Sequence, residues 1–170
     1  PDGRPAQVGG WGAVLGDEGG AAGLVREAAR AVWAAHDRGA EPDALALGLV
    51  ASLDVPEVPA IGAALEAAKD ISAEWGRHAP AVFAAAEAGS ALALAVIEEG
   101  GRSLAALVGR LAARGVPVDD VVVAGSTVLA QPVLYDAFTS ALSDKVPAAR
   151  PQPLRVPPVE GAVALARSLL

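Results

Sequence analysis

Hydrophobic residues recur at helical spacing through most of this chain. Over residues 18–38 they are separated by one, three or four positions, which places them on one face of a helix that Gly39 ends. Asp43 is a suitable N-cap for a second helix through Leu53. A third helix is expected to start between Pro56 and Pro59, and further helices are expected over 71–88, despite Gly76 and Pro80, and over 91–114. The middle of the chain is therefore predicted to be helical.

The pattern changes at residues 118–124, which contain Val121, Val122 and Val123 in sequence. A short β-branched run between a carboxylate pair and a Gly-Ser turn is typical of a strand buried on both faces, the parallel kind. A helix over about 131–142, a short strand near 154–156 and a final helix over 159–170 are expected to follow. Two strand-turn-helix units in this order favour an α/β sheet built by right-handed crossovers.

Composition and charge argue against several classes of function. A chain of 170 residues with 53% hydrophobic residues can bury one substantial core, so a single domain is expected. The net charge is -7 and Lys69 and Lys145 are the only lysines, which leaves no basic stripe for a nucleic acid. There is no cysteine for a disulfide, a thiolate nucleophile or a Cys-ligated metal. No run of about 18 apolar residues spans a membrane, and a soluble, cytoplasmic protein is expected.

The remaining polar residues do not indicate a metal site. His36 and His78 are the only histidines, and they belong to different predicted helices, so their convergence on one metal ion would be a coincidence. Asp119 and Asp120 are neighbours on a strand or turn and therefore point to opposite faces. No metal ligand is expected among these residues.

Residues 9–19 are the richest in candidate chemistry. They combine five glycines with Trp11, Asp17 and Glu18, ahead of the first long helix and after a predicted turn at 1–3 and an edge strand at 6–8. Glycine lets the backbone turn sharply and approach a ligand, and a carboxylate at a helix start either caps the helix or faces a polar ligand. The run is therefore either a tight connection or a ligand-binding turn, in which Trp11 is either buried or stacked on a ligand.

Three groups of motifs, in this order, resemble the C-terminal half of the N-acetylglucosamine kinase and BadF/BadG/BcrA/BcrD ATPase family, within the sugar kinase, Hsp70 and actin superfamily. The groups are residues 1–3 with 9–12 and 16–19, residues 79–82 with 86–89, and residues 121–126 with 157–162. Together they cover nearly the whole chain. The resemblance implies an α/β, RNase H-like C-terminal domain over residues 1–170, helix-rich with a small mixed sheet, that forms one jaw of a two-domain kinase.

The resemblance also implies which residues bind ligands. The sugar would be held by Gly10, Trp11, Gly12 and Asp17, while Glu18 serves the helix start. The adenine of ATP would lie at Gly125 and Ser126, at the end of a strand, with Gly76 on the facing helix. A carboxylate accepts hydrogen bonds from vicinal hydroxyls, and a glycine backbone approaches a sugar closely. The resemblance thus predicts an amino-sugar or hexose site beside an ATP site, used with Mg²⁺.

The resemblance places several parts of the kinase before Pro1: the phosphate motifs, the catalytic Asp and most of the Mg²⁺ ligands. No catalytic residue is therefore assigned within this chain. This chain alone is expected to be inactive. Residues 20–23 are Gly-Ala-Ala-Gly where the family has Ser and bulky aromatics, which predicts a looser helix start. Two alternatives to an ATP-dependent sugar kinase stay open: a BadF-type ATPase that activates a dehydratase, and a non-catalytic dimerisation or ligand-binding module. The resemblance also leaves open whether two copies of the chain form a homodimer.

Overall fold

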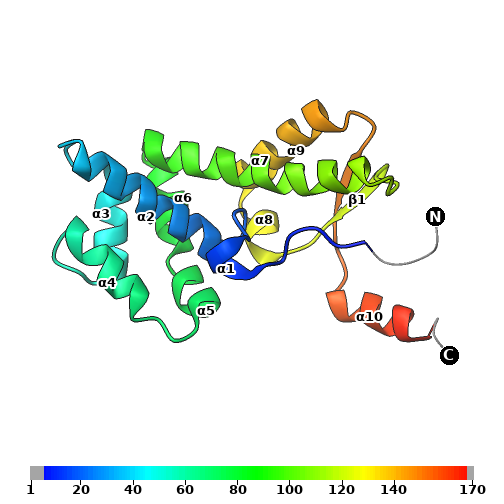
Figure 1. Cartoon of the computed structure of the whole chain (residues 1–170), viewed down its shortest axis with the longest axis horizontal. Helices are drawn as coiled ribbons and strands as arrows, with labels where there is room; N and C mark the ends of the chain where they lie inside the picture. The colour runs from blue at the N-terminus through cyan, green and yellow to red at the C-terminus, as the bar shows by residue number, and fades with distance from the viewer. Residues whose placement is uncertain (1–5, 168–170) are drawn as a thin grey trace.

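The computed structural model describes residues 6–167, and helices dominate it (Figure 1). The helices are α1 (Gly12–Leu15), α2 (Ala21–Asp37), α3 (Ala44–Leu53), η1 (Val58–Ala60), α4 (Ile61–Glu66), α5 (Ile71–Gly76), α6 (Ala79–Glu87), α7 (Ala91–Ala113), α8 (Ser126–Ala130), α9 (Pro132–Lys145) and α10 (Pro158–Arg167). The strands are β1 (Asp120–Val123) and β2 (Arg150–Pro153). The prediction of a helix-rich α/β domain with a small sheet is confirmed, and the RNase H-like topology stays a prediction.

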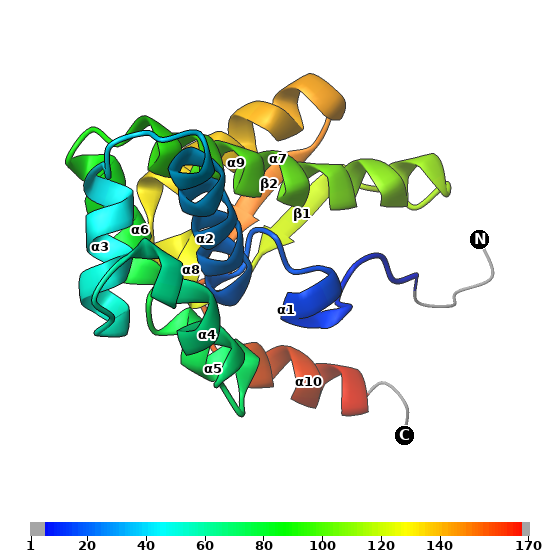
Figure 2. The same ribbon diagram turned by 60° about the vertical axis from the view of Figure 1, so that its left-hand side comes forward.

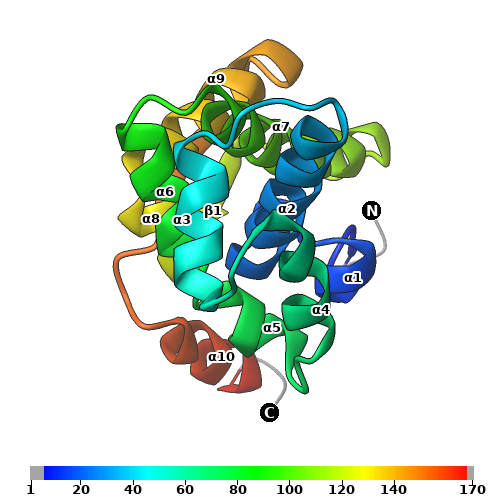
Figure 3. The same ribbon diagram turned by 90° about the vertical axis from the view of Figure 1, so that its left-hand side faces the viewer.

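The core forms around α2, whose apolar face matches the periodicity of the sequence. Leu24, Val25 and Val32 on this face are fully or almost fully buried. In Figure 3, α3 and α6 lie beside α2, with α7 and α9 above them. The α2 helix therefore contacts both the small helices and the long α7, and its N-terminus is held in a fixed place relative to each.

The predicted cap at Asp43 is confirmed and has a second role. Its Oδ1 accepts hydrogen bonds from the backbone N–H groups of Leu45 and Ala46, both at 3.0 Å. Its Oδ2 accepts one from the Ser90 hydroxyl at 2.5 Å, and Ser90 caps α7 through the N–H of Ala93. Two helix starts that are far apart in the sequence are thereby joined by one carboxylate.

The single helix predicted over 71–88 is wrong, because the chain breaks into α5 and α6 at Arg77 and His78. Pro80 lies in the first turn of α6. Proline has no N–H to donate, and its ring clashes with the carbonyl four residues earlier, so a continuous helix is disfavoured there. His78 is buried at the break, where its Nδ1 lies 2.8 Å from the Ser52 hydroxyl and its Nε2 accepts from Arg77 Nε at 3.1 Å.

Acidification is expected to destabilise the protein through His78. Burial, and then the positive charge of Arg77, lower the pKa of the His78 imidazole from its ordinary value of 6.5. In the unfolded chain the histidine has the ordinary pKa, so below it the unfolded state binds more protons. The stability due to neutral His78 is therefore complete above pH 6.5 and is lost as the pH falls through the lowered pKa.

Urea unfolding followed from neutral to acidic pH measures this effect. The loss of unfolding free energy on acidification should be smaller in His78→Gln than in the wild type. His36→Gln is the matched control, because His36 lies exposed on α2 and should leave the loss unchanged. An equal loss in the His78→Gln variant would contradict the assignment to His78.

The sheet pairs β1 with β2 in parallel, from Asp120 opposite Arg150 to Val123 opposite Pro153. The parallel arrangement is confirmed, but the second strand lies before the predicted 154–156, and the sheet of the described residues is not mixed. Burial on both faces is also wrong, because Val123 is 8% exposed and Val122 is 64% exposed. Only the face of β1 that carries Val121 and Val123 packs against the core.

The two ends of the described chain lie outside this core (Figure 2). The edge strand predicted at 6–8 does not form, and the Gln7 carbonyl instead accepts a hydrogen bond from Arg114, the C-cap of α7, at 2.7 Å. The predicted last helix is confirmed as α10, while the turn at 1–3 and positions 168–170 lie outside the described residues.

No individual helix among residues 6–167 has both the length and the apolar composition to cross a membrane. Two bent helix pairs, Ala44–Leu53 with Val58–Glu66 and Ile71–Glu87 with Ala91–Ala113, meet those two criteria only when each pair is taken together.

Candidate functional site

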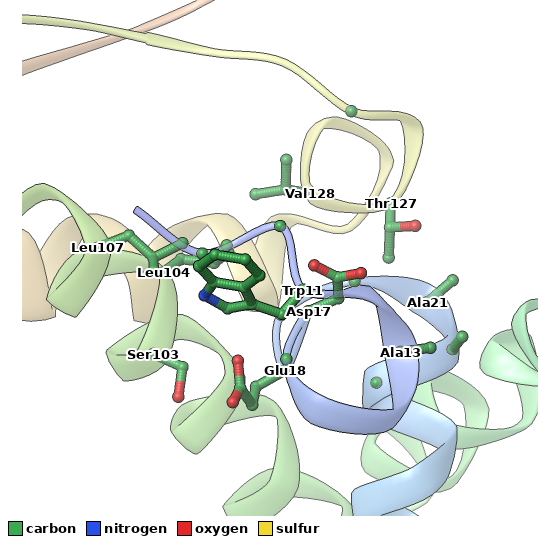
Figure 4. A pocket seen from close by; sticks show the side chains of 18 of the residues that line it. Trp11, Ala13, Asp17, Glu18, Ala21, Ser103, Leu104, Leu107, Thr127 and Val128 are labelled. Carbon is green, nitrogen blue, oxygen red and sulfur yellow. The ribbon is translucent and has the colours of Figure 1, made fainter. Parts of the chain in front are cut away.

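A cavity of about 630 Å³ opens where three distant segments meet (Figure 4). One wall is the glycine-rich loop with α1 and the start of α2, within residues 9–23. A second wall is the face of α7 that carries Ser103, Leu104, Leu107 and Arg110. The third is the turn from β1 into α8, residues 124–128, and Ser72 of α5 adds to the lining. Its volume is within the range of small-molecule sites, about 300–1,000 Å³.

The cavity brings together most of the predicted binding residues. Gly10, Trp11 and Asp17, predicted for the sugar, line it together with Gly125 and Ser126, predicted for adenine. The two groups are far apart in the sequence, yet they line one opening. This proximity is what a site for two substrates requires.

Gly12 and Gly76 are placed differently from the other candidates. Gly12 begins α1 and is not among the residues that line the cavity. Gly76 ends α5 and does not line the cavity either, and a side-chain Cβ there would lie 3.4 Å from the Cβ of Ala21, at an ordinary contact distance. Its predicted role beside a nucleotide stays a prediction.

Asp17 has a backbone conformation that few residues adopt. Its φ is +56°, in the left-handed region, and its carbonyl accepts a hydrogen bond from the Gly20 N–H at 2.8 Å. Asp and Asn tolerate this region better than other non-glycine residues, although the conformation still costs free energy. The carboxylate is exposed and, in Figure 4, projects from the loop toward the α8 turn that carries Thr127. Asp17 therefore lies in the lining of the cavity, in a backbone conformation that the surrounding contacts maintain.

Trp11 is not a core residue, since 72% of it is exposed. Figure 4 shows the Asp17 carboxylate to one side of its indole and the Glu18 carboxylate below the indole, on the side of Ser103. An exposed indole with hydrogen-bond acceptors nearby can stack on the apolar face of a ring while the acceptors accept hydrogen bonds from its hydroxyls. Of the two interpretations of Trp11, burial is therefore wrong.

Arg26 of α2 does not line the cavity, but it supports the glycine-rich wall, and the sequence did not indicate this contact. Its Nη1 donates hydrogen bonds to the carbonyls of Ala13 and Gly16, the latter at 3.0 Å. Its Nε donates to Glu27 Oε1 at 2.7 Å. Two of these acceptors are backbone carbonyls, which every residue has, so no residue pattern could have pointed to the contact.

The looser helix start predicted from residues 20–23 is wrong at Gly23. A Cβ at this position would lie only 2.0 Å from the carbonyl oxygen of Asp17, so a side chain would collide with the backbone. Ala22 and Gly23 are buried under the loop. The small residues therefore allow the Asp17 turn to pack directly on the first turn of α2.

The charged side chains that line the cavity are Asp17, Glu18 and Arg110. Within residues 6–167 no group of three or more His, Cys, Asp or Glu side chains is arranged to hold a metal ion.

The model of the BadF/BadG/BcrA/BcrD ATPase family matches residues 1–166 of the chain. No match was found among curated proteins.

Proposed function

Because the chain belongs to the BadF/BadG/BcrA/BcrD ATPase family, we propose that its cavity binds ATP beside an amino sugar such as N-acetylglucosamine. In the whole protein, the γ-phosphoryl group would pass to a hydroxyl of that sugar. Membership of an ATPase family indicates ATP binding. The sugar is supported by one observation: Gly10, Trp11 and Asp17 of one predicted half-site line the same cavity as residues 125–126 of the other.

The sugar half of the proposed site is the wall made by Trp11 and Asp17. The Asp17 carboxylate accepts hydrogen bonds from two neighbouring hydroxyls, and the exposed indole of Trp11 covers one face of the ring. The backbone at Gly10 approaches the sugar without a side chain in between. These groups orient the acceptor hydroxyl and keep it in one pose.

The nucleotide half is the turn after β1. Ala124, Gly125 and Ser126 are small residues that line the cavity at the carboxyl end of a parallel strand, where ligands of α/β sheets bind. Small side chains leave room for a purine there. This turn therefore positions the adenosine end of the nucleotide, with its phosphates directed toward the sugar.

The reaction would exchange one P–O bond for another. The sugar oxygen bonds to the γ-phosphorus, the bond to the β–γ bridging oxygen breaks, and the hydroxyl proton goes to a base that we place elsewhere in the whole protein. Bound ATP supplies the phosphoryl group, and Mg²⁺ offsets its charge. Residues of this chain contribute by holding the acceptor in line, which is a large part of phosphoryl-transfer catalysis.

ADP production by the whole protein, with and without N-acetylglucosamine, tests the proposal, together with calorimetry of each ligand. We expect binding of both ligands and ADP production that depends on the sugar. ATP hydrolysis that is independent of sugar, without sugar binding, would instead indicate an activator ATPase. Binding of neither ligand would indicate a non-catalytic module.

A further inference from the structure

Two arginines one turn apart on α2 are in opposite environments. The side chain of Arg26 is 14% exposed and that of Arg30 is 74% exposed, although both reach Glu27 Oε1, at 2.7 and 3.8 Å. Burying a guanidinium costs free energy unless its N–H groups are paired. The contacts that Arg26 makes with the glycine-rich loop therefore offset the cost of its low exposure.

Arg26 satisfies carbonyls that α1 cannot satisfy alone. The α1 helix has four residues, and a helix this short is not stable by itself. The carbonyls at its C-terminal end have no partner within the helix, and the Arg26 guanidinium donates to those of Ala13 and Gly16. A hydrogen bond from a charged donor is stronger than one between neutral groups. Arg26 thus fixes the end of α1 on the surface of α2.

Asp17 comes directly after the carbonyl that Arg26 holds. Its own carbonyl accepts from the Gly20 N–H at 2.8 Å and rests against Gly23. The Asp17 turn is therefore anchored to α2 on both sides, by Arg26 before it and by the first turn of the helix after it. Both anchors oppose relaxation of the unfavourable φ of +56°.

We propose that Arg26 is a positioning residue, which holds the Asp17 carboxylate in place and so sets the affinity of the site for its sugar. The part of the proposal that concerns the sugar rests on the proposed function. The part that concerns the loop does not, because the anchoring can be measured without any ligand.

Hydrogen exchange of the free protein tests the anchoring. In Arg26→Met, the amides of Gly16 and Gly20, which donate to Gly12 and Asp17 at 2.8 Å, should exchange about tenfold faster or more. Arg30→Met is the matched control and should leave both rates unchanged. If Arg26→Met does not fold, Arg26→Lys keeps one donor and should show a smaller increase. Unchanged exchange in a folded Arg26 variant would overturn the proposal.

A double-mutant cycle tests whether Arg26 acts through Asp17. Arg26→Met and Asp17→Asn should each raise the Kd for N-acetylglucosamine, and the double variant should bind as weakly as Asp17→Asn alone. The Kd for ADP should change little in any of them. Additive losses would show that Arg26 acts independently of Asp17. Absence of sugar binding in the wild type would contradict the proposed function, while the exchange rates would still decide the role of Arg26.

Discussion

Replacing Gly101 with valine is expected to lower the free energy of unfolding by about 3 kcal/mol. Gly101 lies where α7 crosses α9, and a Cβ there would lie 2.7 Å from the backbone of Ala137 and Phe138. Because the opposing atoms are backbone, they cannot rotate away, and the two helices would have to separate. Gly101→Ala should show a smaller loss, since the better helix propensity of alanine offsets about 1 kcal/mol of the overpacking.

Gly109 provides the matched control on the same helix. A Cβ at Gly109 has no heavy atom within 4 Å apart from its own helix, so a new side chain would not clash with another segment. Gly109→Val should stay within about 0.5 kcal/mol of the wild type, and Gly109→Ala should raise stability by up to about 1 kcal/mol. Urea unfolding followed by circular dichroism measures all four variants. Equal effects of valine at the two positions would mean that α7 and α9 do not cross as described.

Asp17→Asn is expected to raise the Kd for N-acetylglucosamine roughly tenfold to a hundredfold, with the fold intact. The amide has the size of the carboxylate and also tolerates a left-handed backbone, so the turn at φ +56° should persist. What is lost is the negative charge that strengthens hydrogen bonds from the sugar hydroxyls. Calorimetric titration with the sugar measures the loss, and the Kd for ADP should stay near the wild-type value.

Asp54 is the natural control for this substitution. It is the other non-glycine residue of the described chain with a positive φ, at +53°, and it caps the end of α3 outside the cavity. Asp54→Asn therefore makes the same chemical change in the same backbone conformation and should leave the sugar Kd unchanged. A wild-type sugar Kd in Asp17→Asn, or an equal loss of sugar affinity in both variants, would show that Asp17 does not bind the sugar.

The helical part of the fold follows from local rules. The apolar period of α2, the cap at Asp43 and the long α7 were all predicted within a few residues. The break before α6 was not predicted, although Pro80 carried the signal, because the apolar pattern on both sides of it was taken as decisive. The position of β2 was missed because its four residues include Pro151 and Pro153, which are unusual in strands.

Of the candidate site, too, one part was predicted from the sequence and another was not. Residue types and their order indicated the glycine-rich loop and the Gly125 turn, and the family that they indicated is confirmed. Their meeting in one cavity, together with the face of α7, could not be predicted, since it depends on how α2 and α7 pack. Arg26 was missed for a related reason: its partners in the loop are backbone carbonyls rather than side chains.

The sequence by itself determined most of the long helices, the cap at Asp43 and the family, because hydrophobic period, capping side chains and motif order are properties of neighbouring residues. Only the tertiary structure decided that Val122 is exposed while Val123 is buried, that Gly23 lies beneath the Asp17 carbonyl, and that Trp11 faces a cavity. Each of these depends on which distant atoms come to lie against a residue. Burial and close approach are set by such contacts between segments, and a linear pattern does not specify them.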